Sequence, residues 1–111
     1  MKLRCVALPL LALIFTNCSA ARAEEPDASN PFHCGVAFSV YYGMAKATEN
    51  NNAVEVLERR MRTEAARAAA LPASKRTRAE GEALSERLLA DPGEAYETVV
   101  ACMKRQDAVA S

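Results

Sequence analysis

The chain has few of the residues that build catalytic or metal sites. Its 111 residues include one His, no Trp and four Cys. A zinc site needs about four N, S or O ligands, and no acidic residues stand at a spacing that would complete such a set. A c-type haem needs C-x-x-C-H, whereas His33-Cys34 has no second Cys nearby. No triad, phosphate loop or pair of carboxylates is present either. We therefore expect no catalytic residue, no metal and no cofactor, and predict that the protein is not an enzyme.

Long apolar runs are also lacking. The longest covers residues 5–15, and a membrane-spanning helix needs about twenty apolar residues, so we expect no stable membrane span. Basic residues precede this run, and Ala21 and Ala23 follow it in an A-x-A pattern. This arrangement is typical of a cleaved signal peptide, predicted over residues 1–23, with a mature start near Glu24.

Cys18 raises the alternative of a lipid anchor, because it follows the apolar run. The residues before it, from Phe15 to Asn17, lack the aliphatic and small residues of a lipobox. We therefore predict a periplasmic or secreted protein without an acylated Cys18.

Neither sign of charge dominates. The chain has 14 basic and 14 acidic residues. Removal of residues 1–23 takes away three basic residues and no acidic one, which leaves a net charge of about −3. A mildly acidic, exported protein is not expected to bind nucleic acid.

Two Cys remain beyond the predicted signal peptide, Cys34 and Cys102. In an oxidising compartment, two Cys most simply form one disulfide, which also removes the free thiol that a Cys-His catalytic pair would need. We predict a Cys34–Cys102 bond. His33 is then a half-exposed residue of a first helical turn, and a pH-sensitive or ligand-binding role for it is the weaker alternative.

No stretch alternates apolar and polar residues with a period of two, so the fold class predicted is all-α. Residues 24–30 are acidic and polar, which indicates a flexible leader before a helical domain over residues 31–108. Cap and break signals divide that domain into four helices. The first begins at Asn30-Pro31 and has a polar stripe at Gly35, Ser39, Tyr42 and Lys46. The second runs from the Asn52–Glu55 capping box to about Ala70, with Val54, Leu57, Met61, Ala65 and Ala68 on one face. The third spans about Ser74 to Ala90, with Leu84, Leu88 and Leu89 on its apolar edge, and the fourth runs from Asp91-Pro92 to about Asp107, with Tyr96, Val99, Val100 and Met103 as its buried stripe.

The predicted disulfide tests this helix count. Cys34 falls in the first turn of the first helix, and Cys102 is expected in the last turns of the final one. In an up-down bundle those ends meet only if the number of helices is even. The prediction is therefore a small up-down bundle of four helices with one disulfide.

Two basic clusters form a further candidate site. Arg59, Arg60 and Arg62 precede the predicted break at Pro72, and Lys75, Arg76 and Arg78 follow it. A turn at Pro72 could bring them together as a patch for an anionic surface. Glu residues interleave with both clusters, which favours a solvated helix face instead.

The function predicted is that of a small exported helical protein acting through contacts with another protein, of unstated oligomeric state. In size, export and its single disulfide the chain resembles the periplasmic acid-stress chaperones, a likeness that covers format and no motif. The alternative is a small-molecule or metal carrier that uses a pocket between helices.

Overall fold

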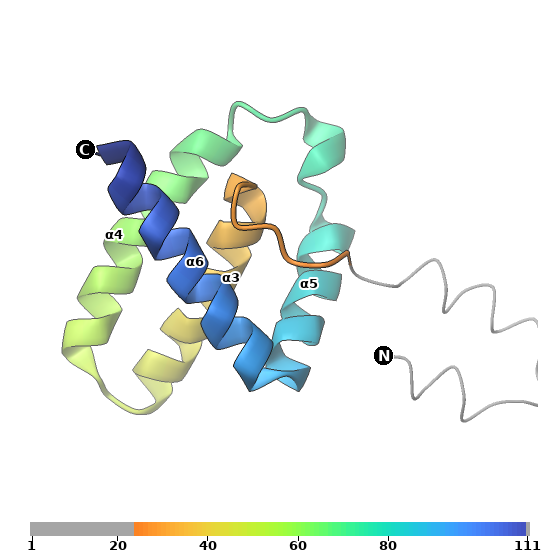
Figure 1. Cartoon of the computed structure of the whole chain (residues 1–111). Coiled ribbons are helices and arrows are strands. Elements are labelled where there is room, and N and C mark those ends of the chain that lie inside the picture. Colours follow the sequence, from red (N-terminus) through yellow and green to blue (C-terminus); the bar gives the residue numbers. More distant parts are fainter. Residues whose placement is uncertain (1–23, 111) are drawn as a thin grey trace, which may run out of the picture.

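The computed structural model describes residues 24–110, and this part of the chain is all-α (Figure 1). Its elements are α3 (Pro31–Ala47), α4 (Asn51–Ala68), the short 3₁₀ helix η1 (Ala73–Lys75), α5 (Arg78–Ala90) and α6 (Pro92–Ala110). Successive α-helices run in opposite directions, so the predicted small up-down bundle of four helices is confirmed. The predicted signal peptide, residues 1–23, lies outside the described residues.

Two of the four helices begin at the caps that the sequence predicts. The Asn30 side chain accepts a hydrogen bond from the Phe32 N–H at 2.9 Å, with Pro31 at the first helical position. The Asp91 carboxylate accepts from the Glu94 N–H at 3.1 Å. Both caps satisfy backbone donors that the first turn of a helix leaves without partners.

The turn between α3 and α4 places the second cap two residues earlier than predicted. Asn50, and not Asn52, caps α4, because its side chain accepts from the Ala53 N–H at 3.2 Å. The Asn50 N–H also donates to the Ala45 carbonyl at 2.9 Å, and Glu49 takes a left-handed conformation with φ of 58°. This is the Schellman ending of α3, and it fixes Asn50 at the junction.

Helix α5 begins at Arg78 instead of the predicted Ser74. Thr77 caps it by accepting from the Glu80 N–H at 3.2 Å. The preceding basic residues, Lys75 among them, are therefore outside its first turn, where the helix dipole would disfavour them. The sequence signal was the T-x-x-E spacing from Thr77 to Glu80.

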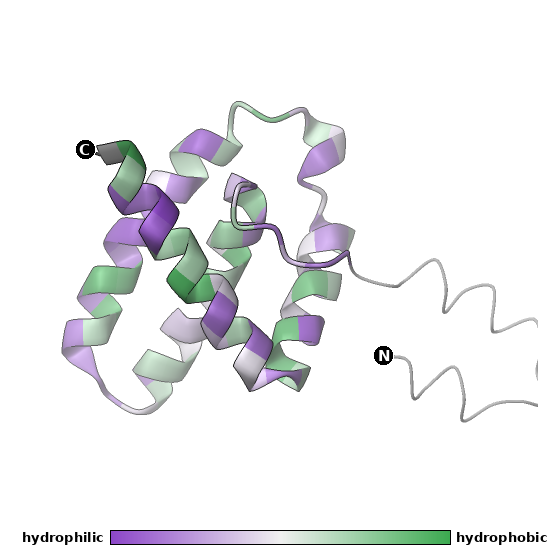
Figure 2. Cartoon of the chain, viewed as in Figure 1, coloured by the Kyte–Doolittle hydropathy of each residue, from purple (hydrophilic) through white to green (hydrophobic). Residues whose placement is uncertain are grey.

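Helix α3 is the centre of the bundle. It packs against each of the other three helices, with α4 and α5 beside it and α6 crossing one of its faces diagonally (Figure 1). Apolar residues occupy the middle of α6, where it crosses α3 (Figure 2). The buried apolar residues are Cys34, Ala37, Phe38, Ala45, Leu57, Leu84, Leu88, Ala95, Val99 and Cys102.

Three residues that the sequence placed on apolar faces, Ala65, Leu89 and Tyr96, are exposed. Tyr96 is 60% exposed and Leu89 is 62% exposed. Because α6 crosses α3 at an angle, it packs through Ala95, Thr98 and Val99, which turns Tyr96 outward.

Cys34 and Cys102 are joined by a disulfide, with 5.7 Å between their Cα atoms. Cys34 is in the first turn of α3, as predicted. Cys102 is near the middle of α6, whereas the sequence placed it in the last turns. The crossing angle explains this difference, because the middle of α6 meets the start of α3 and its C-terminal half continues towards α4.

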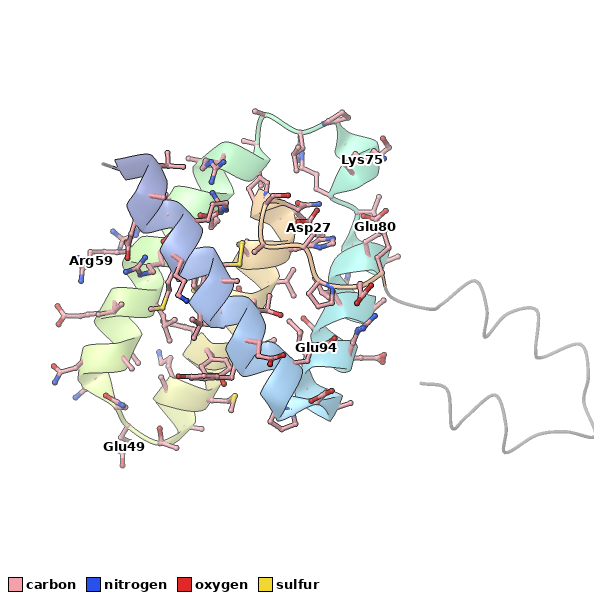
Figure 3. The ribbon with its side chains drawn as sticks, viewed as in Figure 1. Asp27, Glu49, Arg59, Lys75, Glu80 and Glu94 are labelled. Carbon is pink, nitrogen blue, oxygen red and sulfur yellow. A yellow bond between two sulfur atoms is a disulfide. The ribbon has the colours of Figure 1, made fainter. Side chains whose placement is uncertain are left out.

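The bundle is also tied together at its other end. Arg87 of α5 donates two hydrogen bonds to the Glu94 carboxylate of α6, at 2.8 and 2.9 Å. Glu94 lies between the two helices in Figure 3. These bonds raise the pKa of Arg87 above its ordinary value. The tight turn between α5 and α6 is therefore braced by a bidentate ion pair.

Candidate functional site

An open groove of about 1240 Å³ runs along the face of α3 that α6 does not cross. Helix α3 forms its floor, and α4 and α5 form its two walls. The largest apolar side chains that line it are Phe32, Val36 and Met61. On the α4 side the lining residues extend from Met61 to Ala69, the C-cap of that helix, a length of about 12 Å at 1.5 Å per residue. The groove is therefore about as long as two turns of helix.

Small residues four positions apart line this groove on each side. The pairs are Gly35 and Ser39 on α3, Ala65 of α4 with Ala69 at the C-cap of that helix, and Gly81 and Ser85 on α5. Residues four apart lie on one face of a helix. Small residues at that spacing let another backbone approach closely, as they do between packed helices.

The polar stripe predicted for the first helix points into this groove over part of its length. Gly35 and Ser39, two members of the stripe, line the groove. A Cβ at Gly35 would lie 3.9 Å from the Glu64 Cβ, and a Cβ at Gly81 would lie 3.2 Å from the Phe32 ring. A side chain at Gly81 would therefore crowd the Phe32 ring, whereas a Cβ at Gly35 would make an ordinary van der Waals contact.

Glu64 is part of the α4 wall of the groove, and its side chain is fully buried. Its carboxylate accepts hydrogen bonds from Arg105 and Gln106 of α6, and Arg67 lies 3.7 Å from it. Gln106 also donates to the Arg60 carbonyl at 3.1 Å. A buried charge is tolerated only when it is paired and hydrogen-bonded, and α6 supplies both partners here.

Sequence reasoning missed this cluster. Glu64 stands seven residues after Leu57 and three after Met61, so it falls on the helix face predicted to be apolar. The sequence signal for this cluster was a charged residue on an otherwise apolar helix face, which indicates a buried carboxylate that needs a partner. Its partner was not predictable, because the cation comes from α6, forty-one residues further on.

Arg105 connects the Glu64 cluster to the segment before α3. Its Nε donates to the Ala28 carbonyl, and the Asp27 N–H donates to His33 Nδ1 at 3.0 Å. This part of the predicted flexible leader, residues 24–30, is therefore held against the bundle. The buried Nη1 of Arg105 has no hydrogen-bond partner among the described residues.

Asp27 shapes the bend of this segment. Its carboxylate accepts from the Ser29 hydroxyl at 2.7 Å and from the Ser29 N–H at 2.9 Å. These two hydrogen bonds lower the pKa of Asp27 below its ordinary value. The segment is thus held by local polar contacts at an exposed carboxylate.

His33 is buried, at 7% exposed, and not half-exposed as predicted. Its Nδ1 accepts a backbone hydrogen bond, so this nitrogen carries no proton in the structure. It lies in the same first turn of α3 as Cys34, whose sulfur is in the disulfide. The geometry assigns His33 to anchoring the leader segment.

The two predicted basic clusters do not form a single patch. Arg62, Arg76 and Arg78 line the rim of the groove. Arg60 instead donates to Gln106 at 2.9 Å and to Asp107 at 3.2 Å on α6. Arg59 and Lys75 do not line the groove, and Figure 3 shows both on the outside of the bundle.

Within residues 24–110, no group of His, Cys, Asp and Glu side chains is arranged to hold a metal ion. None of the helices in the same range is long and apolar enough to span a membrane. The comparisons with known proteins find no family model, no curated protein and no solved structure that matches this chain.

Proposed function

We propose that this protein is an exported binding module that takes a short apolar helix of a partner protein into the groove between α4 and α5. The observation that carries the proposal is the set of small residues that α3, α4 with its C-cap, and α5 present to an apolar groove. Helix-in-groove recognition needs an apolar channel into which spaced side chains of the partner can fit. Phe32, Val36 and Met61 supply apolar surface between the small residues.

The dimensions of the groove support a helical occupant. Two turns of helix, about 12 Å long and about 10 Å in diameter, fill a cylinder of about 950 Å³. The groove offers about 1240 Å³ and is open along its length. A drug-sized ligand is instead held in an enclosed cleft that covers most of its surface.

The proposal assigns no catalytic step to the protein. Cys34 and Cys102 are in a disulfide, and His33 is engaged by the backbone. The alternative function is a carrier of small apolar molecules, which would use the same groove. The apolar side chains of its walls favour that candidate.

A peptide-display selection on the folded protein tests the proposal, with two matched variants. Ala65 and Ala66 are adjacent exposed residues of α4, and only Ala65 lines the groove. Arg is a good helix former, so Ala65→Arg and Ala66→Arg should be equally stable. We expect Ala65→Arg to lower the affinity for the selected peptides by at least about tenfold, the loss expected at a central anchor. Ala66→Arg should leave that affinity unchanged.

Equal binding by the two variants would contradict the groove as the site. Native mass spectrometry of the protein purified from its own compartment separates the two functions. A small molecule retained by the wild type and lost in Ala65→Arg would favour the carrier. N-terminal sequencing of that material should give a start at or near Glu24, and a start at an acylated Cys18 would refute the predicted export route.

A further inference from the structure

The charges on the rim of the groove are not evenly distributed. Arg76 and Arg78 lie at the end where the chain passes from α4 to α5. Glu82 and Glu86 follow along the α5 wall, and Glu86 is about 12 Å from Arg78 along the helix axis. The groove therefore has a basic end and, on the α5 side, an acidic stretch.

The dipole of α5 adds positive potential at the basic end, while the C-terminal end of α4 adds partial negative charge there. Helix α5 begins there, with Thr77 as its cap, and the N-terminus of a helix carries a partial positive charge. The Arg76 Nε donates to the Leu71 carbonyl at 2.9 Å, which holds its guanidinium near the end of α4. Arg78 is 91% exposed and pairs with Glu82 at 3.1 Å. An exposed pair of this kind is weak, so a partner carboxylate can compete for Arg78.

The opposite end of the groove has both signs of charge on different walls. Arg62 stands on the α4 wall, where Glu58 lies 3.7 Å from it. Glu86 stands on the α5 wall. A basic residue of a bound helix would be attracted on the α5 side and repelled on the α4 side.

We infer, on the basis of the proposed function, that the partner helix lies antiparallel to α5 with its C-terminal end at Arg76 and Arg78. The partner helix carries Asp or Glu in its last turn and Lys or Arg in its first turn, on the side that faces α5. Its own dipole places partial negative charge at the basic end, so the backbone and the side chains favour the same direction.

Two peptides test this orientation, both built on the tightest sequence from the display selection. One carries two Lys in its first turn and two Glu in its last, and the other has these charges exchanged. Both are N-acetylated and C-amidated, which removes the terminal charges. The exchanged peptide is the better isolated helix, because its charges match its own dipole. Tighter binding of the first peptide therefore cannot come from helix propensity.

We expect the first peptide to bind about five- to tenfold more tightly at low ionic strength, measured by fluorescence anisotropy. The difference should shrink as salt is added, because the rim charges are exposed. The double variant Arg76→Glu/Arg78→Glu should reverse the preference. Lys75→Glu is the matched control, because Lys75 belongs to the same segment without lining the groove, and it should keep the preference.

Equal binding of the two peptides by the wild type would overturn the orientation while leaving the proposed function intact. A preference that persists in the double variant would overturn it as well. If the selection yields no peptide that depends on Ala65, the proposed function fails and the orientation fails with it.

Discussion

Replacement of Glu64 by Gln should lower the free energy of unfolding by about 2–3 kcal/mol. The carboxylate is fully buried and accepts hydrogen bonds from Arg105 and Gln106. A hydrogen bond to a charged group contributes about 1.5–3 kcal/mol. Gln keeps the shape and one acceptor, but its amide group would face the donor of Gln106. The Arg105 guanidinium, whose side chain is only 17% exposed, would also lose its counter-charge.

Gln is preferred to Ala because the protein must still fold. Removing one partner of a buried ion pair costs about 3–5 kcal/mol, which approaches the whole stability of a small domain. The control is Glu82→Gln, which removes the exposed ion pair with Arg78. That pair is expected to contribute about 0–0.5 kcal/mol.

Urea denaturation followed by far-UV circular dichroism measures both variants. The urea concentration at the unfolding midpoint should be clearly lower for Glu64→Gln than for the wild type. For Glu82→Gln it should equal that of the wild type. A double-mutant cycle with Arg105→Met should give a coupling energy of at least about 1 kcal/mol. Equal stability of Glu64→Gln and wild type would refute the reasoning, because the buried charge would then contribute nothing.

Three further predictions concern the disulfide, the turn between α3 and α4, and the leader segment. Cys102→Ser should lower the free energy of unfolding by about 2–5 kcal/mol in chemical denaturation, and two free thiols in native material would contradict the bond. Glu49→Gly should raise the free energy of unfolding by roughly 0.5–1 kcal/mol, because Gly takes a left-handed φ of 58° without the steric strain that a Glu side chain causes there, and a loss of stability would contradict this. In an NMR titration the pKa of Asp27 should lie below the ordinary value of about 3.9 and rise towards it in Ser29→Ala. Because the folded pKa is lowered, the stability from this contact is present above about pH 4 and is lost as pH falls through the folded pKa. An unchanged pKa in Ser29→Ala would remove the assigned cause.

Local signals in the sequence were sufficient for much of the fold. The caps at Asn30 and Asp91 depend on residues at most three positions away, so a short window contains all the information. The disulfide followed from the count of Cys outside the predicted signal peptide. The number of helices followed from the breaks together with that bond.

The starts of α4 and α5 were predicted at the wrong residues, because the sequence offers competing local signals there. Asn50 and Asn52 both offer a capping side chain, and the Schellman ending of α3 selects Asn50. Thr77 and Ser74 both precede the third helix, and the cap at Thr77 keeps Lys75 out of its first turn. The start of α4 thus depended on the neighbouring helix, whereas the start of α5 followed the local spacing from Thr77 to Glu80.

The sequence by itself determined that the described chain forms helices and where two of them begin, because caps and turns act over three or four residues. It also indicated which two Cys are bonded, because only Cys34 and Cys102 lie beyond the predicted signal peptide. Only the tertiary structure decided the angle at which α6 crosses α3. That angle places Cys102 near the middle of its helix, exposes Tyr96 and brings Arg105 to Glu64. It also leaves the opposite face of α3 uncovered, and the groove exists for this reason. Packing between residues forty or more positions apart sets such an angle, and no local pattern encodes it.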